Sequence, residues 1–568
     1  MARMARMARA KKIKIIKKEV SKMRKLNRSL ILWLLVTLGL VWIPARGTTY
    51  KESAAGACSD PDADPDAKGF YDKIDTFTDW DVNYYAKYSN CVESQYASGS
   101  NNEGSYIDLS HIHYHVGHGG SHADSGNNDT KLTAIVFEGD SLTDDQTYLD
   151  ASEAQGSWGD DKLDWIAFRC CKLLNNTSWK YWAKTMNGLH LILGFYTVST
   201  VDDNFGKTWA DKMQTQTIAQ AWFSTVDSSQ PFYVTARVIG ETDECYKDYL
   251  HGMGSVSDDP TPDDTKSTWL HFAGVSFVPI HAGNLQGIIR QVVIPRVINA
   301  AIVRLIGQAF GFGPNHDVEE SEDYYSMSRT DGQGPDPMNP GNPSHILYVY
   351  KNSGIYYYQN LGRLWRVDLD NPPGIYPASS APARAYQFLT DPSHINLYPD
   401  DVHEYYVNED VITIENINSG EPETFQVHRC VNYSRELPAE TGTMASVVGP
   451  GAKLKVYIDE DGGIIGAMGN WREIQTAGMV NIISKVEAWN RFVQYGQEAV
   501  LNPIYLEYDN VQTDMNTATI GYYEASCLEN QSELIPVWIF NTRYYKNGDL
   551  IETVYTYIPA ATSPGGSF

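Results

Sequence analysis

The sequence lacks the short cysteine and histidine motifs that mark several common kinds of site. Its seven cysteines form no C-x-x-C and no C-x-x-C-H, which excludes a zinc ribbon, a thioredoxin-type redox centre and c-type haem attachment. H-E-x-x-H, the signature of many zinc peptidases, is also absent. The uncharged stretch at 30–43 spans about 21 Å as a helix, short of the roughly 30 Å hydrocarbon core of a bilayer.

Basic residues are scarce beyond the first fifty positions. Residues 1–50 carry 13 Lys and Arg and one acid, so the remaining chain has a net charge of −37 against −25 for the whole. A surface this acidic repels the phosphate backbone, and we therefore expect no nucleic-acid partner. The charge suits high salt, binding of divalent cations, or solubility alone.

The N-terminal segment at 1–47 resembles a targeting signal. A basic region precedes the apolar stretch at 30–43, and small residues, Ala45 and Gly47, follow it. This order is typical of a secretory signal, with an uncleaved anchor as the alternative. We expect a secreted or cell-surface protein whose membrane contact is transient and made through this segment.

The length of 568 residues and three changes in sequence texture predict several regions. Residues 48–262 alternate apolar strands, at 132–139, 163–171, 189–198 and 231–240, with helical stretches at 175–187 and 205–226. Such alternation is typical of an α/β sheet sandwiched by helices. The strand at 189–198 is too apolar to have a solvent-exposed face, so we expect it at the centre of the sheet, buried on both sides.

The later regions differ in pattern. The connecting region at 263–370 holds a predicted strand and helix within 285–310, and a Pro/Gly/Asn loop at 331–343. Residues 371–568 predict an α+β region of two helix-plus-hairpin modules. Their helices are expected at 381–391 and 484–496. Their hairpins are expected at 452–474, with an Asp-Gly-Gly turn, and at 534–560, turning at Asn547-Gly548.

Four of the fourteen histidines lie in the stretch HIHYHVGHGG at 111–120. His111, His113 and His115 alternate, so on a strand all three point to one face. With His118 and His122 nearby they are candidate metal ligands, and the pattern is similar to the H-x-H-x-D-H of metallo-β-lactamase-like hydrolases, although the Asp-His is missing. The alternatives are a half-buried polar strand and the histidine half of a catalytic pair.

The predicted strand at 163–171 ends on two thiols, Cys170 and Cys171. Functional groups of parallel α/β sheets gather at the carboxyl ends of strands, where a nucleophile is expected. A thiol with a pKa near 8.5 is only about 3% thiolate at pH 7, so it needs a base such as His118. The glycines beside His118 allow a substrate to approach, and their N–H groups can stabilise an oxyanion.

This order of motifs resembles the caspase–gingipain–legumain group of cysteine peptidases. It is more closely similar to an uncharacterised prokaryotic family of exported caspase/gingipain-like domains, over residues 70–260. The shared features are a GHG loop at 117–119, a Trp-containing strand that ends at the cysteine pair, and the elements GLHLILGF at 188–195 and AWF at 221–223.

The resemblance implies specific roles for four residues. His118 matches the catalytic histidine and Cys171 the nucleophile, with Cys170 in the place of a preceding small residue. The backbone N–H groups of Gly119 and Cys171 would form the oxyanion hole. Because the usual small residue is itself a cysteine here, either thiol can be the nucleophile. Cys245 is a candidate disulfide partner for Cys170, and a disulfide through Cys171 would abolish the activity.

The remaining cysteines and the acidic clusters suggest structural roles. Outside the cell cysteines pair, and by region the candidates are Cys58 with Cys91 and Cys430 with Cys527. Acidic clusters at 60–66, 124–130 and 459–463 have oxygen ligands at short spacing, so structural Ca²⁺ is a candidate. None fits an EF-hand, and solvated turns are the alternative. No cofactor is required by the predicted chemistry.

The C-terminal modules resemble the PepSY-like modules of propeptides and inhibitory domains, which implies a binding, chaperoning or inhibiting role. The sequence therefore predicts an exported cysteine endopeptidase acting on a peptide or protein substrate. Two alternatives remain: a catalytically inactive cell-surface binding or structural protein of the same fold, and a metallohydrolase built on the histidine cluster.

Overall fold

The computed structural model describes residues 49–56, 63–99, 103–123, 131–137, 148–200, 202–272, 285–331, 335–336, 341–366, 374–418, 421–440, 442–496 and 510–562. The predicted signal or anchor at 1–47, Cys58 and the acidic cluster at 124–130 lie outside these ranges. Within them, every helix is too short or too polar to cross a bilayer.

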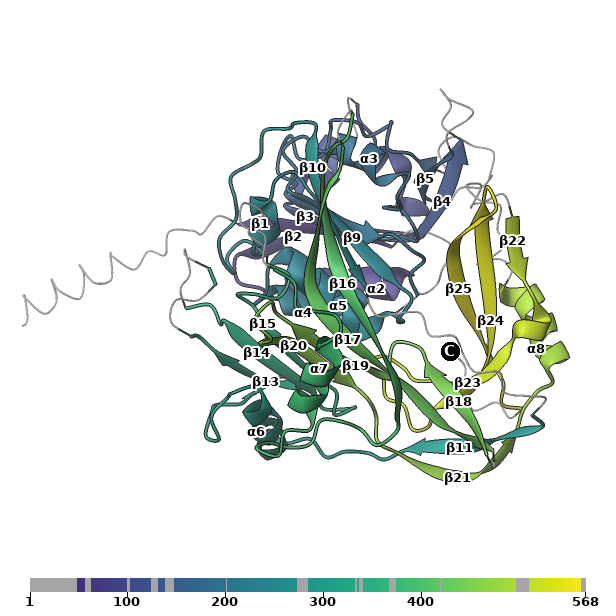
Figure 1. Ribbon diagram of the computed structural model, residues 1–568. Coiled ribbons are helices and arrows are strands. Elements are labelled where there is room, and N and C mark those ends of the chain that lie inside the picture. The colour runs from purple at the N-terminus through teal and green to yellow at the C-terminus, as the bar shows by residue number, and fades with distance from the viewer. Residues whose placement is uncertain are drawn as a thin grey trace, which may run out of the picture. The chain divides into compact units, whose positions relative to one another are not determined.

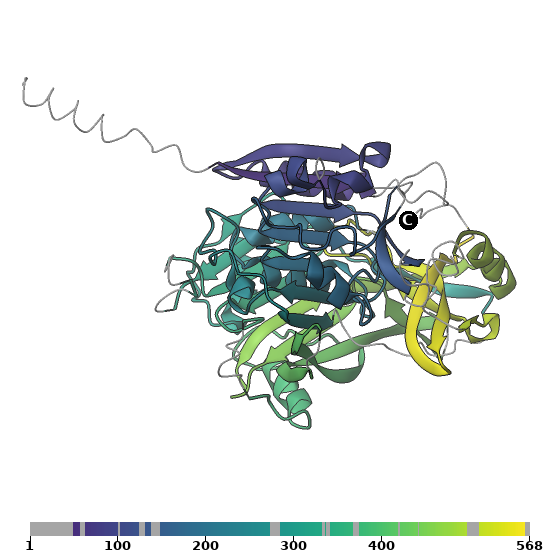
Figure 2. The ribbon, with the colours of Figure 1, turned by 90° about the horizontal axis from the view of Figure 1, so that it is seen from above.

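A mixed sheet is built from the first half of the chain (Figure 1). Four strands run parallel in the order β1, β3, β7, β8, and β9 and β10 then follow in antiparallel orientation. β2 pairs with β1 on the other side, and Figure 2 shows the strands of this sheet side by side. The bounds are β1 Tyr50–Gly56, β2 Trp80–Lys87, β3 Ile112–Val116, β7 Trp165–Arg169, β8 Leu191–Phe195, β9 Thr235–Gly240 and β10 Thr265–Phe272.

Both faces of this sheet are covered. On one face Tyr114 of β3 contacts Phe70 of α2 and Trp209 of α4, at ring-centroid distances of 5.1 and 5.6 Å. On the other face Phe168 of β7 packs on Trp158. All residues of β7 and β8 are buried, as expected for strands without a wet face. The helices are α2 Ala63–Ile74, α3 Trp179–Trp182, α4 Phe205–Met213 and α5 Ile218–Ser229.

A small antiparallel sheet begins where β3 ends. It consists of β4 His118–Ala123, β5 Lys131–Val136 and β6 Tyr148–Leu149. Short helical turns connect the larger elements. The 3₁₀ turns are Tyr88–Asn90, Glu93–Gln95, Glu103–Ser105, Ile107–Leu109, Ala183–Thr185, Glu244–Lys247 and Met515–Thr517, and a π-helical turn spans Phe492–Gly496.

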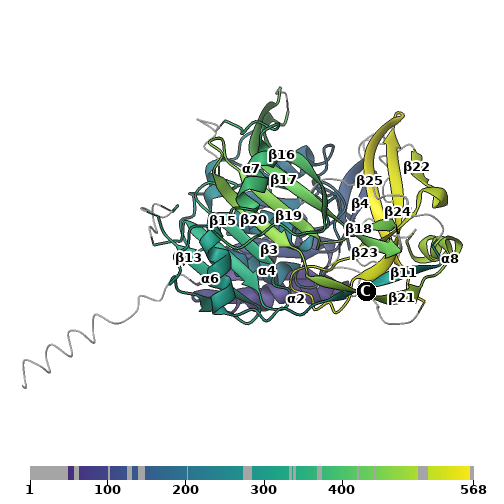
Figure 3. The same ribbon diagram turned by 60° about the horizontal axis from the view of Figure 1, so that its bottom comes forward.

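An antiparallel sheet continues from β10 through the middle of the chain. β16 pairs with β10, and the order continues β17, β19, β20, β15, β14, β13, β12. Figure 3 shows α6 and α7 beside these strands. The bounds are β12 Glu319–Glu320, β13 Tyr324–Arg329, β14 His345–Tyr350, β15 Tyr356–Asn360, β16 Val402–Asn416, β17 Glu423–Glu440, β19 Lys453–Ile458, β20 Ile464–Asn470, α6 Ala300–Ala309 and α7 Ala381–Leu389.

The C-terminal strands form a further layer with its own apolar core. β18 pairs with β17 and, in parallel, with β23; β24 pairs with β23, β22 and β25, and β11 pairs with β21. The bounds are β11 Gly287–Val293, β18 Thr443–Val448, β21 Ile474–Asn481, β22 Asn510–Thr513, β23 Thr519–Tyr523, β24 Ile535–Lys546, β25 Asp549–Pro559 and α8 Lys485–Arg491.

Most of the predictions that rest on short stretches of sequence are confirmed. β8 lies between β7 and β9, and β11 is followed by α6 as expected for 285–310. Both predicted hairpins form, and Asn547 and Gly548 take φ values of 53° and 88°, which suit a two-residue turn. The predicted strand at 132–139 forms as β5, but it belongs to the small separate sheet. The expected helix at 205–226 is two helices, because Thr217 caps a new helix through the N–H of Gln220.

The chain from Lys51 onward forms one compact unit. Its first sheet does not end at the predicted boundary between 262 and 263, because β10 joins β9 to β16. The strands of the connecting region and of the C-terminal region therefore extend the sheet that carries the predicted site.

Candidate functional site

The sequence-predicted site residues follow two neighbouring parallel strands. Val116 of β3 pairs with Arg169 of β7, and the N–H of Gly117 donates to the carbonyl of Arg169 at 3.3 Å. His118 lies two residues beyond the end of β3, and Cys171 two residues beyond the end of β7. Both therefore lie at the carboxyl edge of the sheet, where parallel α/β proteins concentrate functional groups.

Gly119 lies directly against the backbone of Cys171. A Cβ atom at Gly119 would be 2.0 Å from the carbonyl oxygen of Cys171 and 3.1 Å from its nitrogen. No side chain fits at that distance, so a glycine is required for this approach. The start of β4 and the residue after β7 are thus packed backbone to backbone, and this contact holds the His118 loop beside the cysteine pair.

The two thiols of the pair differ in environment. Cys170 is fully buried in the apolar core, whereas Cys171 is partly exposed and His118 is exposed. The backbone N–H of Ser199 points at the Cys171 sulfur, with an N···S distance of 3.4 Å. The thiol in turn donates to the carbonyl oxygen of Ser199, with an S···O distance of 3.6 Å.

The residue after the cysteine pair has an unusual backbone. Lys172 adopts φ 57°, in the left-handed region, although it carries a side chain. Its N–H donates to the carbonyl of Thr197 at 2.9 Å, and its ammonium lies 4.6 Å from the ring centroid of Tyr544 on β24. Such a conformation costs of order 1–3 kcal/mol and is found most often at functional sites.

A buried ion pair fixes the surroundings of this edge. Arg169, the last residue of β7, pairs with Asp66 of α2 and donates to the carbonyl oxygens of Thr200 and Asp202, both at 3.1 Å. Tyr114 of β3 donates to the same Asp66 carboxylate at 2.8 Å. Arg169 and Asp66 therefore connect β7 and β3 to α2 and to the loop after β8, next to the candidate site.

Two of the three alternating histidines, His113 and His115, are internal polar residues of β3, whereas His111 precedes the strand and is half-buried. His113 and His115 are fully buried, and the Tyr96 hydroxyl lies between them, 3.0 Å from His113 Nε2 and 2.8 Å from His115 Nδ1. Burial lowers the pKa of both imidazoles, that of His115 to about 3. This geometry favours the polar-strand interpretation over the metal one, since a phenol fills the space between the rings. The side chain of His122 lies outside the described residues.

Two of the predicted cysteine pairings, Cys170–Cys245 and Cys430–Cys527, are wrong. Cys245, Cys430 and Cys527 are all thiols. The Cys170–Cys245 pair fails because the two residues lie at opposite edges of the sheet: Cys170 follows the end of β7, whereas Cys245 lies beside His190, which precedes β8. The Cys430–Cys527 pair likewise does not form, and the Cys58–Cys91 prediction falls on the undescribed Cys58.

The acidic cluster at 459–463 is a hairpin turn. The N–H of Gly463 donates to the Asp461 carboxylate at 2.8 Å, and Arg363 forms ion pairs with Asp459 and Asp461. Because the Arg363 guanidinium already pairs with these carboxylates, the geometry favours a turn over a Ca²⁺ site at this position. In the first cluster, Asp66 is committed to its ion pair with Arg169.

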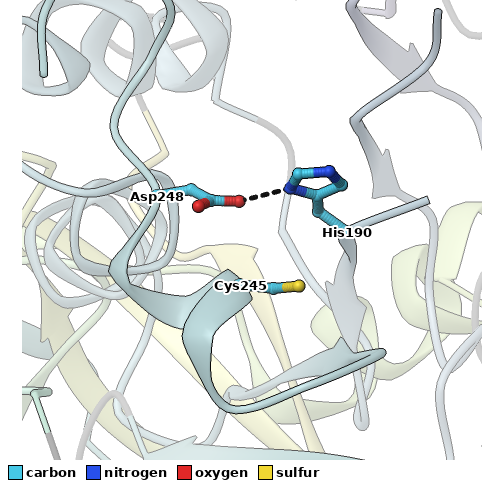
Figure 4. A group of neighbouring side chains, drawn as sticks. All are labelled: His190, Cys245 and Asp248. Atoms are coloured by element: carbon cyan, nitrogen blue, oxygen red, sulfur yellow. Dashed lines mark hydrogen bonds and ion pairs between the residues drawn. The ribbon is translucent and has the colours of Figure 1, made fainter. Parts of the chain in front are cut away.

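A second polar cluster lies at the opposite edge of the sheet, and the sequence analysis missed it. His190 Nδ1 is 2.6 Å from an Asp248 carboxylate oxygen, and the Cys245 thiol lies beside them (Figure 4). Asp164, just before β7, and Asp259 face the other nitrogen of the same ring. The available signal was a polar residue directly before each of two buried strands, in LDWIAF and LHLILGF.

Comparisons with known proteins give a partial family match. Residues 48–273 match a family model described as a domain of unknown function (DUF6345). An uncharacterised protein from Eubacterium rectale with a solved structure is 10% identical, at a TM-score of 0.27, over 49% of this chain and 84% of that protein. No curated protein matches. The matched family covers the first sheet, and with it both the His118–Cys171 edge and the His190 cluster.

Proposed function

We propose that this protein is a caspase/gingipain-like cysteine endopeptidase with Cys171 as nucleophile and His118 as acid/base. The observation that carries the proposal is the pair of neighbouring parallel strands, β3 and β7, which end in Gly117-His118-Gly119 and Cys170-Cys171. Residues more than fifty positions apart in the sequence are thereby brought to one edge of the sheet, where both can reach a bound peptide.

The proposed chemistry is acyl transfer. His118 takes the proton of the Cys171 thiol, and the thiolate attacks the carbonyl carbon of the peptide bond. The C–N bond breaks as His118 returns the proton to the leaving amine, and water then hydrolyses the thioester. The N–H groups of Gly119 and Cys171 are assigned to the oxyanion. Their close packing supports this assignment, because two donors aimed at one point must come from adjacent backbone.

Three features support Cys171 over Cys170 as the nucleophile. Cys171 is partly exposed whereas Cys170 is fully buried. The N–H of Ser199 lies at its sulfur. Lys172, directly after Cys171, adopts the left-handed backbone conformation that is found most often at functional sites.

The proposal is tested by mapping iodoacetamide alkylation of the native protein at pH 7 by mass spectrometry. We expect Cys171 to be alkylated first, because burial raises the pKa of the Cys245, Cys430 and Cys527 thiols to about 11, 12 and 11. His118→Ala should slow alkylation of Cys171 at least about tenfold. The matched control is His394→Ala, which removes an imidazole at the surface beside α7.

Hydrolysis of a fluorogenic peptide library supplies the second measurement. Cys171→Ala should abolish turnover, and His394→Ala should leave it unchanged. An alkylation rate at Cys171 that is equal in wild type and His118→Ala, together with no turnover by wild type, would reject the peptidase. The inactive cell-surface binding protein of the same fold would then be the function to pursue.

A further inference from the structure

The amino edge of the first sheet carries a polar cluster that the proposed thiol chemistry does not use. His190 directly precedes β8 and Asp164 directly precedes β7, and the N–H of His190 donates to the Asp164 carbonyl at 2.8 Å. Asp259 reaches the same point from the connection between β9 and β10. Cys171 lies seven positions after Asp164, about 23 Å along a strand, so this cluster is remote from the thiol.

The His190 ring is held by its Nδ1 atom. Asp248 accepts there at 2.6 Å (Figure 4). The Asp248 carboxylate is itself fixed by Ser257, whose hydroxyl and N–H donate at 2.8 and 2.7 Å. Asp248 is 1% exposed and His190 is fully buried. A carboxylate on one ring nitrogen fixes the tautomer so that the other nitrogen carries its lone pair, the usual support of a metal-ligating histidine.

The second ring nitrogen faces two carboxylates without a hydrogen bond. His190 Nε2 is buried and has no hydrogen-bond partner. The carboxylate oxygens of Asp259 and Asp164 lie 3.5 and 3.8 Å away, longer than an ordinary N–H···O hydrogen bond. A buried polar atom left in this state costs about 1–3 kcal/mol.

The spacing of these three atoms is that of ligands around a cation. Nε2 of His190 and the carboxylate oxygens of Asp164 and Asp259 lie within 4.8 Å of one another. Ligands about 2.0–2.2 Å from a tetrahedral ion are about 3.3–3.6 Å apart, so a small contraction closes the shell. Asp164 is supported in turn by His251, whose Nε2 lies 2.7 Å from its other oxygen.

Charge and access also favour a cation. Three carboxylates surround the His190 ring, and two of them, on Asp164 and Asp248, are largely withdrawn from water. The side chain of Asp259 is 80% exposed, which leaves an entry path and room for a water ligand. Cys245 lies with Asp248 on the Nδ1 side of the ring, so it is not among the proposed ligands of Nε2.

We propose that His190, Asp164 and Asp259 bind one divalent first-row transition-metal ion, with Asp248 orienting the imidazole. One nitrogen and two carboxylate oxygens suit such an ion better than Ca²⁺, which takes oxygen ligands alone. The ion would join the starts of β7 and β8 to the β9–β10 connection, three segments that no described disulfide links. This site is independent of the proposed peptidase activity.

The test uses the purified full chain, stripped with EDTA, with Zn²⁺ as the probe. Metal content is measured by mass spectrometry after desalting, and affinity by competition with a chromophoric chelator. We expect one zinc ion per chain in wild type. Asp259→Asn should weaken binding at least about tenfold, and His190→Gln should abolish it. Because Asp259 is exposed, its variant keeps the fold, which a thermal melt without metal verifies.

Asp258→Asn is the matched control, because it removes the same charge from the adjacent exposed position. We expect its zinc affinity to stay within about twofold of wild type. Two outcomes overturn the proposal: wild type that binds no zinc, and an Asp259→Asn variant that binds as tightly as wild type. Zinc bound at His118 and Cys171 instead would produce the second outcome, and Cys171→Ala would then abolish zinc binding.

Discussion

Glu52 is a carboxylic acid buried in a strand without a partner for its side chain. It lies on β1, is fully buried, and both carboxyl oxygens lack a hydrogen bond. Burial, with a smaller contribution from the Asp75 charge, raises its pKa to about 8. The acid is therefore neutral in the folded protein at pH 7, although in the unfolded chain it is ionised above about pH 4.5.

This difference makes stability depend on pH in a stated direction. The folded pKa is the higher one, so the contribution of Glu52 is complete below pH 4.5 and is lost as the pH rises to 8. We expect Glu52→Gln, which is neutral throughout, to be increasingly more stable than wild type over this window, by a few kcal/mol and at most about 5 kcal/mol. Urea unfolding of both proteins from pH 5 to 9 measures it.

The control for Glu52 is Glu319→Gln, an exposed acid on β12. Its difference from wild type should stay within about 0.5 kcal/mol at every pH. If the difference in unfolding free energy between Glu52→Gln and wild type does not change with pH across this window, the Glu52 carboxyl is ionised in the folded protein.

At the scale of elements, the junction between β3, β4 and β7 depends on one glycine. Gly119→Ala places a methyl group 2.0 Å from the Cys171 carbonyl oxygen, a backbone atom that no side-chain rotation can move. We expect a loss of about 2–4 kcal/mol in the free energy of unfolding and a changed alkylation rate at Cys171. Gly478→Ala, in β21 where nothing lies within 4 Å, is the control and should change neither quantity. Wild-type stability of Gly119→Ala would contradict the packing described here.

At the scale of the whole molecule, buried charges join the first sheet to the central one. Asp227 of α5 forms ion pairs with His271 of β10 and with Lys455 of β19, and His271 also pairs with Asp410 of β16. Burial alone would raise the pKa of Asp227, but Lys455 and His271 hold it below its usual value. The four side chains are almost completely buried and come from both sides of the predicted boundary at 262–263.

Removing one member of this group should weaken both regions together. We expect Lys455→Met to cost about 3–5 kcal/mol, since it leaves a buried carboxylate undercompensated, and the unfolding transition to stay single. Lys351→Met, which breaks the exposed Lys351–Glu320 pair, should cost less than about 1 kcal/mol. Calorimetry measures both. Two separated transitions in wild type would show that the regions fold independently.

Local chemistry allowed much of the fold to be predicted. The buried strands β7 and β8 follow from unbroken apolar runs, and the hairpins from their Asp-Gly-Gly and Asn-Gly turns, because neighbouring residues alone decide these structures. The strand that ends at Cys170-Cys171 was recognised in the same way. The neighbourhood of β3 and β7 was expected only through a family resemblance, since strand pairing is not a local property.

Long-range contacts decided the rest, and the sequence by itself did not specify them. The cysteine pairings failed because Cys170 and Cys245 are set at opposite edges by the direction of β7. The continuity of the sheet through β10 and β16 depends on pairing across more than a hundred residues. The His190 cluster likewise assembles residues from four separate segments. The sequence determined which segments become strands and where they turn, whereas the tertiary structure decided which side chains meet, because contacts between distant segments depend on the packing of the whole chain.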